Sequence, residues 1–128
     1  GTNDFPHLSW ANLPWGTQNI AVVVEDSTSG MVHLNLVDIP IGSGSFGGFV
    51  ATSGVVTFSA GIEGTNGYGT TGWSGPCQTT GTHSYTVTVF ALSGPIGTAV
   101  DNSSASDFSA AHAGTILGKS SISFTYEE

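Results

Sequence analysis

Four side chains in this sequence have the chemistry and spacing to bind a small polar ligand. Asp26 ends a Val-rich run and His33 follows in the next apolar run, while His83 and Tyr85 begin a later alternating segment. Imidazole and phenol groups supply directional hydrogen bonds, and a carboxylate can fix a histidine tautomer or receive a cation. These residues are therefore the first candidates for a binding site.

Each candidate also has an ordinary structural interpretation. A histidine in a strand can satisfy backbone groups, and Tyr85 can be a strand aromatic with a hydrated hydroxyl. Asp26 can accept N–H groups of the turn that follows it. Asp26, His33 and His83 together also form the carboxylate and imidazole set used by some metal centres. Their spacing alone does not support a metal site, so we expect none.

Catalytic motifs do not accompany these residues. The sequence has no Gly-x-Ser-x-Gly elbow and no His-Glu-x-x-His segment, which are the patterns of hydrolase nucleophiles and metalloproteases. Cys77 is the single cysteine, and nothing basic near it in sequence lowers its pKa. We therefore expect no catalytic residues, no cofactor and no enzymatic activity.

Composition limits the classes of partner. The 128 residues predict a single domain, 1–128, and the 9 acidic residues against 1 basic residue give a net charge of −8. A chain this acidic has no basic stripe for nucleic acid and no Lys/Arg cluster for an anionic bilayer. If the protein meets a lipid, we expect it to bind single headgroups.

The sequence indicates a location only weakly. A surface of Ser, Thr and Gly with few charges favours an extracellular or periplasmic protein, although a cytoplasmic one stays open. No apolar run has the length of a transmembrane segment and no leader is evident at the start. The lone cysteine excludes an internal disulfide, and Asn102-Ser103-Ser104 is a short glycosylation sequon with little weight.

Hydrophobic periodicity predicts the elements that position the candidates. Ile20 to Asp26 is predicted as a buried strand and Met31 to Ile39 as its partner, with His33 on the face opposite Val32, Leu34 and Leu36. His83 to Leu92 is the clearest strand, with His83, Tyr85, Val87 and Val89 sharing a face. Further strands are predicted at Val55 to Ala60 and Ser121 to Tyr126. One short helix, capped by Ser106, is predicted to begin at Asp107. The pattern indicates a mostly-β sandwich with Greek-key-like connections.

Several segments together resemble the phosphatidylethanolamine-binding protein family, which includes the Raf-kinase-inhibitor-like proteins of bacteria and archaea. The matching residues are Leu8-Ser9-Trp10 with Leu13-Pro14, Val22 to Asp26, Val32-His33, Gly75-Pro76-Cys77 with Gly81, His83 and Tyr85, and the closing segment Ala113 to Tyr126. The resemblance covers most of the chain and the segments occur in the family's order.

The resemblance implies a function as well as a fold. It implies a small pocket at one end of a β-sandwich that takes anions such as the phosphate of phosphatidylethanolamine. Carried over by motif, the pocket residues are Asp26, His33, Gly75, Pro76, His83 and Tyr85. We therefore expect a non-enzymatic binding module for a small phosphorylated or anionic ligand. Kinase inhibition depends on surfaces outside these motifs and does not transfer.

Departures from the family motif affect the expected pocket rim and the expected sheet edge. Ser27-Thr28 and Ser84 replace a Pro-Asp pair and an Arg, and Met31 replaces a Trp, so we expect a looser rim. By the resemblance, the family's first strands are expected to be missing from this sequence, either because they were cut off or because something else fills that edge. An open sheet edge completed by a neighbouring chain suggests an alternative function, an extracellular structural or self-assembling subunit that forms a homo-oligomer.

Overall fold

The computed structural model of the chain describes residues 8–9, 12–41, 45–46, 55–56, 61–74 and 82–127. Within them the elements are β1 (Leu8–Ser9), β2 (Asn19–Asp26), β3 (Val32–Pro40), β4 (Ser45–Phe46), β5 (Val55–Val56), β6 (Ile62–Glu63), β7 (Trp73–Ser74), β8 (Thr82–Leu92), α1 (Ala105–Ala111) and β9 (Ile116–Glu127).

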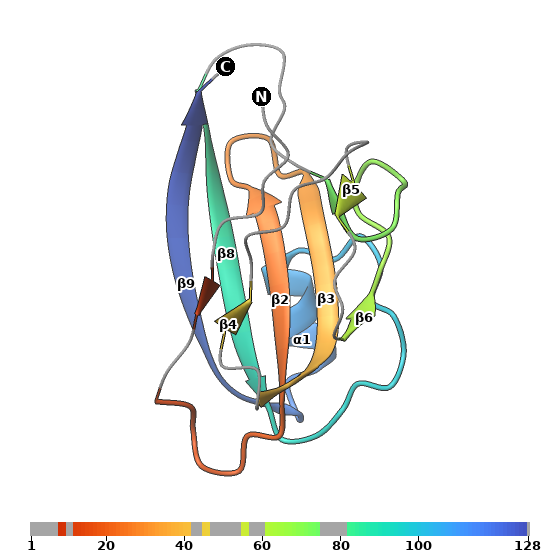
Figure 1. Cartoon of the computed structure of the whole chain (residues 1–128), viewed down its shortest axis with the longest axis vertical. Helices are drawn as coiled ribbons and strands as arrows, with labels where there is room; N and C mark the ends of the chain where they lie inside the picture. Colours follow the sequence, from red (N-terminus) through yellow and green to blue (C-terminus); the bar gives the residue numbers. More distant parts are fainter. Residues whose placement is uncertain are drawn as a thin grey trace.

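One antiparallel sheet dominates the architecture (Figure 1). Its five strands lie in the order β6-β3-β2-β8-β9, and two small sheets pair β1 with β4 and β5 with β7. Strand β8 lies beside β2 on the side away from β3, although β3 follows β2 in the chain. The mostly-β fold with a single short helix among the described residues is the one that the sequence predicted.

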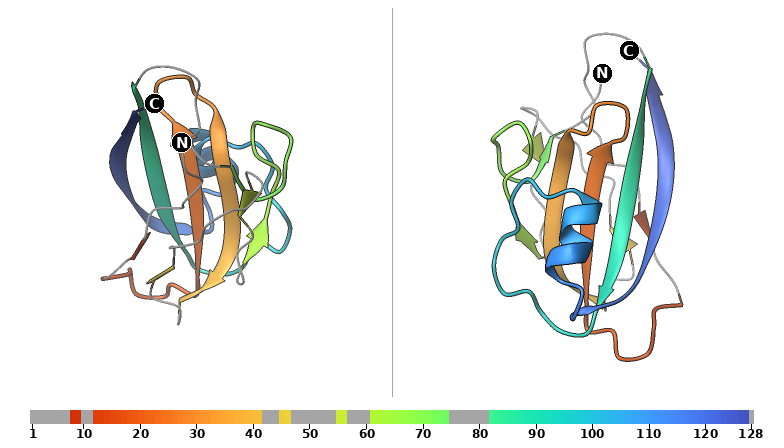
Figure 2. Two further views of the ribbon diagram at one scale, coloured as in Figure 1. Left: turned by 45° about the horizontal axis from the view of Figure 1, so that its top comes forward. Right: turned by 180° about the vertical axis from the view of Figure 1, so that it is seen from behind.

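Both faces of the large sheet are covered at its centre, which explains the unbroken Val run of β2. On one face Val22, Leu34 and Val87 pack with Trp73 of β7. On the other face Val23 and Phe90 pack with Phe108 of α1. Figure 2 shows α1 lying across that second face. A central strand buried on both faces loses the usual alternation of polar and apolar residues.

The helix begins earlier than the sequence predicted. Helix α1 spans Ala105–Ala111, and its N-cap is Ser104, whose Oγ accepts the N–H of Asp107 at 3.0 Å. The prediction that Ser106 caps a helix starting at Asp107 is therefore wrong. Ser103, Ser104 and Ser106 all suit a cap by residue type, and the structure shows that Ser104 precedes the first turn.

A β-bulge in β3 changes the direction of His33. Leu34 pairs with Val24 and Val32 pairs with Glu25, so β3 has one extra residue, His33, between two adjacent partners of β2. The alternation predicted for this strand therefore breaks at His33. Its ring contacts the rings of Trp73 and Tyr85, on the face of Leu34 and not on the opposite one. Bulges re-aim a side chain in this way, and simple alternation cannot predict them.

The other strands follow the prediction with different lengths. The alternation of β8 is confirmed, since Val87 packs in one core and Phe90 in the other. The last strand is longer than expected, spanning Ile116–Glu127. Its first half contains Gly, Lys and Ser, which are weak strand signals, but its residues pair with β8 along its full length. Of the predicted strand at Val55 to Ala60, residues 57–60 lie outside the described residues.

Candidate functional site

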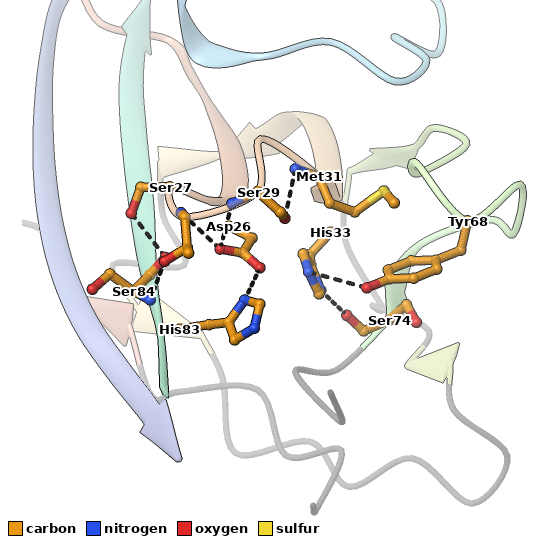
Figure 3. Close-up of polar contacts among 10 residues, drawn as sticks. Asp26, Ser27, Ser29, Met31, His33, Tyr68, Ser74, His83 and Ser84 are labelled. Carbon is orange, nitrogen blue, oxygen red and sulfur yellow. Dashed lines mark hydrogen bonds and ion pairs between the residues drawn. The ribbon is translucent and has the colours of Figure 1, made fainter. Parts of the chain in front are cut away.

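The candidate site lies where β2 turns into β3, beside the first residues of β8 (Figure 3). Asp26 is the last residue of β2 and pairs in register with Tyr85 of β8, which brings His83 alongside. His33 enters from the bulge of β3. The structure therefore brings together Asp26, His33, His83 and Tyr85. Gly75 and Pro76, the other two predicted site residues, lie outside the described residues, as does Cys77.

Asp26 is buried, and the two oxygens of its carboxylate accept hydrogen bonds from different donors. Oδ2 accepts a hydrogen bond from Nδ1 of His83 at 2.6 Å. Oδ1 accepts the backbone N–H groups of Thr28 at 2.8 Å and Ser29 at 3.2 Å. The two interpretations offered by the sequence, a turn-capping carboxylate and a histidine partner, are thus both correct, one for each oxygen.

Two opposing effects act on the pKa of Asp26. Burial raises it, but hydrogen bonds from His83, Ser29 and Thr28 together outweigh burial and hold the pKa below its usual value of 3.8. Asp26 is therefore a carboxylate at neutral pH. Since a carboxylate only accepts hydrogen bonds, the proton in the Asp26–His83 contact resides on Nδ1 of His83.

His33 is completely buried. Each of its two ring nitrogens has one polar neighbour. Nδ1 lies 2.6 Å from the carbonyl oxygen of Ser74, and Nε2 lies 3.5 Å from the hydroxyl of Tyr68. A carbonyl oxygen only accepts, so Nδ1 carries the proton. Tyr68 and Tyr85 stand edge-on to the imidazole, with ring centroids at 5.2 Å and 5.1 Å. Aromatic packing and one strong hydrogen bond thus fix the ring.

Burial lowers the pKa of His33 below its usual value of 6.5. The carbonyl of Ser74 and the charge of Asp26 raise it, and the neighbouring His83 lowers it. The desolvation of the cation is the largest of these effects. At neutral pH the buried imidazole is therefore uncharged, and its Nε2 is an acceptor.

The two histidines differ in their access to a ligand. The His83 side chain is 20% exposed, whereas Asp26 and His33 are fully buried. Both histidines keep their proton on Nδ1, so in the neutral form each leaves a lone pair on Nε2. An anion gains a hydrogen bond from Nε2 only after that nitrogen is protonated. Of the two, His83 is the histidine whose ring is partly exposed, and its Nδ1 is held by Asp26.

The rim of the site is tied together by residues that replace the family pattern. Ser27 donates its backbone N–H to the carbonyl of Ser84 at 2.7 Å, and the N–H of Ser84 bonds the Thr28 hydroxyl at 3.0 Å. These bonds fasten the β2–β3 turn to β8. The Thr28 hydroxyl and the backbone groups of Ser27 and Ser84 thus hold the rim together, and a rim looser than that of the family stays a prediction.

Two residues at the site were not identified from the sequence as site residues, Ser74 and Tyr68. Ser74 contributes a backbone carbonyl, and any residue type supplies that group, so sequence carries no signal for it. Tyr68 stands between Gly67 and Gly69 in a Gly-rich segment. An aromatic residue isolated in a loop is a weak indication of a ligand contact, and only the fold places it over His33.

The described residues of the site do not form a metal centre. No group of three or more His, Cys, Asp or Glu residues there is arranged to hold a metal ion. A cavity of about 280 Å³ lies beside the β2–β3 turn. Its lining residues are Ser29, Gly30, Met31, Val32, Gly67 and Asn102.

Comparison with known proteins shows a single family. The model of the phosphatidylethanolamine-binding protein family matches residues 1–127. A UPF0098 protein from Methanothermobacter thermautotrophicus is 30% identical over 72% of the chain, and the UPF0098 protein YbcL of Escherichia coli is 32% identical over 72%. The chain spans 62% and 54% of the length of these two relatives.

Solved structures show the same fold. The crystal structure of Escherichia coli YbcL, described as a member of the mammalian PEBP family, superposes with a TM-score of 0.76 at 27% identity, covering 98% of this chain and 81% of that one. A PEBP homologue from Chlamydia trachomatis, CT736, superposes with a TM-score of 0.74 at 21% identity, covering 96% and 80%. Among the described residues, no helix has the length and apolar character of a membrane span.

Proposed function

Because the chain belongs to the phosphatidylethanolamine-binding protein family, we propose that it is a non-enzymatic binding module for a small phosphorylated or anionic ligand. The observation that carries this proposal is the pairing of the buried Asp26 carboxylate with the partly exposed His83 imidazole at 2.6 Å. Asp26 orients the ring, and His83 meets the ligand. A phosphorylated headgroup such as that of phosphatidylethanolamine is the ligand we propose.

The proton at Nε2 of His83 controls this binding. Asp26 fixes the other ring proton on Nδ1, so a protonated His83 directs its second N–H away from Asp26. That N–H and the positive charge together form a charge-assisted hydrogen bond to a phosphate oxygen. An ammonium group on the same ligand is attracted by the negative net charge of the protein.

Neither Lys nor Arg lies near enough to replace His83. Lys119 is the only Lys or Arg in the chain, and it pairs with Phe90 on β8. Phe90 lies seven residues from His83 along the same strand, which corresponds to about 23 Å. Affinity for an anion should therefore be weak at neutral pH and should rise as the pH falls.

A titration with O-phosphorylethanolamine tests the proposal. The imidazole NMR signals of His83 should shift saturably at about pH 6 and more weakly at about pH 7.5, since His83 must be protonated to donate. His83→Ala should abolish binding, whereas His112→Gln, at the C-cap of α1 on the other face of the sheet, should not. If millimolar ligand caused no saturable shifts at both pH values, the proposal would be contradicted.

One observation favours a second candidate function, self-assembly through a sheet edge. Strand β9 is the last strand of the large sheet and has one partner, β8, among the described strands. Its 12 residues include the exposed apolar side chains of Leu117 and Ile122. Long edge strands with exposed apolar groups pair readily with other strands. A particle mass above that of the monomer in solution would support this function, and a monomer would exclude it.

A further inference from the structure

Asn66 and Gly67 are neighbours in the loop that joins β6 to β7, residues 64–72. An asparagine that precedes a glycine can lose its side-chain amide, because the backbone nitrogen of the glycine can attack Cγ of the asparagine. Glycine permits this approach well, since it has no side chain in the way and its backbone takes many conformations. The pair is therefore chemically reactive in an open chain, and the fold decides whether it reacts.

The reaction consumes water and needs no other reactant. A bond forms between the Gly67 nitrogen and Cγ of Asn66 while the bond from Cγ to Nδ2 breaks. Nδ2 takes the glycine N–H proton and leaves as ammonia. Water then opens the cyclic imide, at one carbonyl to give aspartate and at the other to give isoaspartate. In net, an amide and one water become a carboxyl group and ammonia.

The folded protein holds the Asn66 amide on both sides. Asn66 is 2% exposed, and its Nδ2 donates to the Gly72 carbonyl and to Thr70 Oγ1, each at 2.9 Å. Its Oδ1 accepts the N–H of Tyr68 at 2.9 Å and the Thr70 hydroxyl at 3.1 Å. A carbonyl only accepts and a backbone N–H only donates, so these partners fix the orientation of the amide. Attack makes Cγ tetrahedral and moves Nδ2 and Oδ1 away from these partners.

The attacking nitrogen is held as well. Gly67 donates its N–H to the Val32 carbonyl of β3 at 2.7 Å, and the nitrogen must lose this proton before it can attack. A Cβ atom at Gly67 would lie 2.3 Å from the Met31 sulfur and 3.1 Å from the Val32 carbonyl oxygen. The loop therefore approaches β3 as closely as a residue without a side chain permits. The fold thus needs the same glycine that makes the sequence reactive.

We propose that Asn66 is a deamidation site that the β6–β7 loop controls. While the loop lies on β3, both reacting groups are held in other bonds. When the loop leaves β3, the Gly67 nitrogen and the Asn66 side chain are freed together and meet water. The rate of deamidation is therefore set by the fraction of molecules in which the loop is open. This modification involves no ligand and goes beyond the proposed binding function.

The product does not restore the closed loop. A carboxylate at position 66 places an oxygen against the Gly72 carbonyl, where Nδ2 of Asn66 now donates at 2.9 Å. Two acceptors repel each other, and a charge in a site that is 2% exposed loses its hydration. Isoaspartate adds a methylene group to the main chain and displaces Gly67 from its bond to β3. Deamidation thus makes a transient opening of the loop permanent.

Tyr68 connects this modification to the histidine site. It follows Gly67 in the loop, and its ring packs edge-on against His33 with the ring centroids at 5.2 Å (Figure 3). The Tyr68 N–H is itself bonded to Oδ1 of Asn66. Loss of the closed loop therefore removes a packing partner from the buried imidazole of His33. The modification acts as a one-way switch on the surroundings of His33.

Peptide mass spectrometry after incubation in ¹⁸O-labelled water tests the proposal, because deamidation adds one solvent oxygen at Asn66. The folded protein should convert at least about ten-fold more slowly than the same chain in urea. Thr70→Val removes the hydroxyl that bonds both Nδ2 and Oδ1, so the folded variant should convert about three-fold faster or more, with no change in urea. Thr71→Val is the matched control, since Thr71 is the next, exposed residue, and it should change neither rate.

Each outcome bears on a separate step. Equal rates for the folded and the urea-unfolded wild type would overturn control by the loop, as would equal rates for folded Thr70→Val and wild type. No conversion at Asn66 in urea would overturn the modification site itself. After conversion in urea and refolding, the Gly67 amide should exchange its hydrogen faster and the imidazole NMR signals of His33 should move. If both stayed as in the unconverted protein, the one-way switch would be overturned, and none of these results bears on ligand binding.

Discussion

At the residue scale, Asp26 connects ionisation to folding. Its carboxylate accepts bonds from His83, Thr28 and Ser29 while fully buried. The folded protein therefore favours the ionised form, and the pKa lies below 3.8. The unfolded chain binds this proton more readily, so the stabilisation by Asp26 is fully present above about pH 4 and is lost as the pH falls through the folded pKa.

Asp26→Asn should make that dependence visible. At neutral pH the variant should lose about 1–3 kcal/mol of unfolding free energy, because an amide accepts hydrogen bonds more weakly and its NH₂ group opposes the donors. The wild type should lose stability as the pH falls below about 4, and the variant should lose less there. Urea unfolding at each pH measures both effects. Glu25→Gln, the adjacent residue of β2, is the control, and an equal response of both variants would contradict this account.

The bulge at His33 is also a residue-scale feature, with consequences for prediction. The identities of Asp26, His33, His83 and Tyr85 as site residues came from motif resemblance, and their proximity is confirmed by the register of β2, β3 and β8. The direction of His33 was predicted wrongly, since one extra residue in β3 moved it to the other face. Local alternation contains no signal for such a bulge.

At the element scale, the start of helix α1 separates two serines that the sequence does not distinguish. Ser104 supplies the capping oxygen, and Ser106 lies exposed within the first turn. The helix has 7 residues, too few to be stable without tertiary packing. Phe108, fully buried against Phe90 at a centroid distance of 4.7 Å, supplies that packing.

Alanine at Ser104 and alanine at Ser106 should change the unfolding free energy by different amounts. Ser104→Ala should lower the unfolding free energy by about 1 kcal/mol because the Asp107 N–H loses its acceptor. Ser106→Ala should change it by less than about 0.5 kcal/mol, since alanine favours the helix interior and no cap is lost. Thermal or urea unfolding of the matched pair measures both. A larger loss in Ser106→Ala than in Ser104→Ala would contradict the observed helix start.

At the scale of the whole molecule, the two candidate functions use different parts of the sheet. The histidine site lies at the β2–β3 turn, and the edge proposed for self-assembly runs along β9. The site and the edge are joined by β8, which carries His83 and Tyr85 and pairs with β9 along its length. Variants of the histidine site can therefore be compared with variants of the β9 edge in the same fold.

Self-assembly through β9 predicts a specific response to charge. Ile122 is 51% exposed, so Ile122→Lys should leave the fold intact and weaken self-association about ten-fold or more, because a charge on an edge strand opposes pairing. Thr98→Lys adds the same charge to an exposed loop and should have no effect. Sedimentation equilibrium measures the association. Unchanged association in Ile122→Lys would exclude β9 as the contact.

The sequence by itself determined the family, the mostly-β class, the main strands and the site candidates. Composition, periodicity and motif order depend only on which residues the chain contains and in what order. Tertiary structure alone decided which nitrogen of each histidine keeps its proton, through Asp26 and the Ser74 carbonyl. It also decided that Tyr68, from a distant loop, covers His33. These contacts depend on packing between segments far apart in the chain, and residue type or spacing does not encode them.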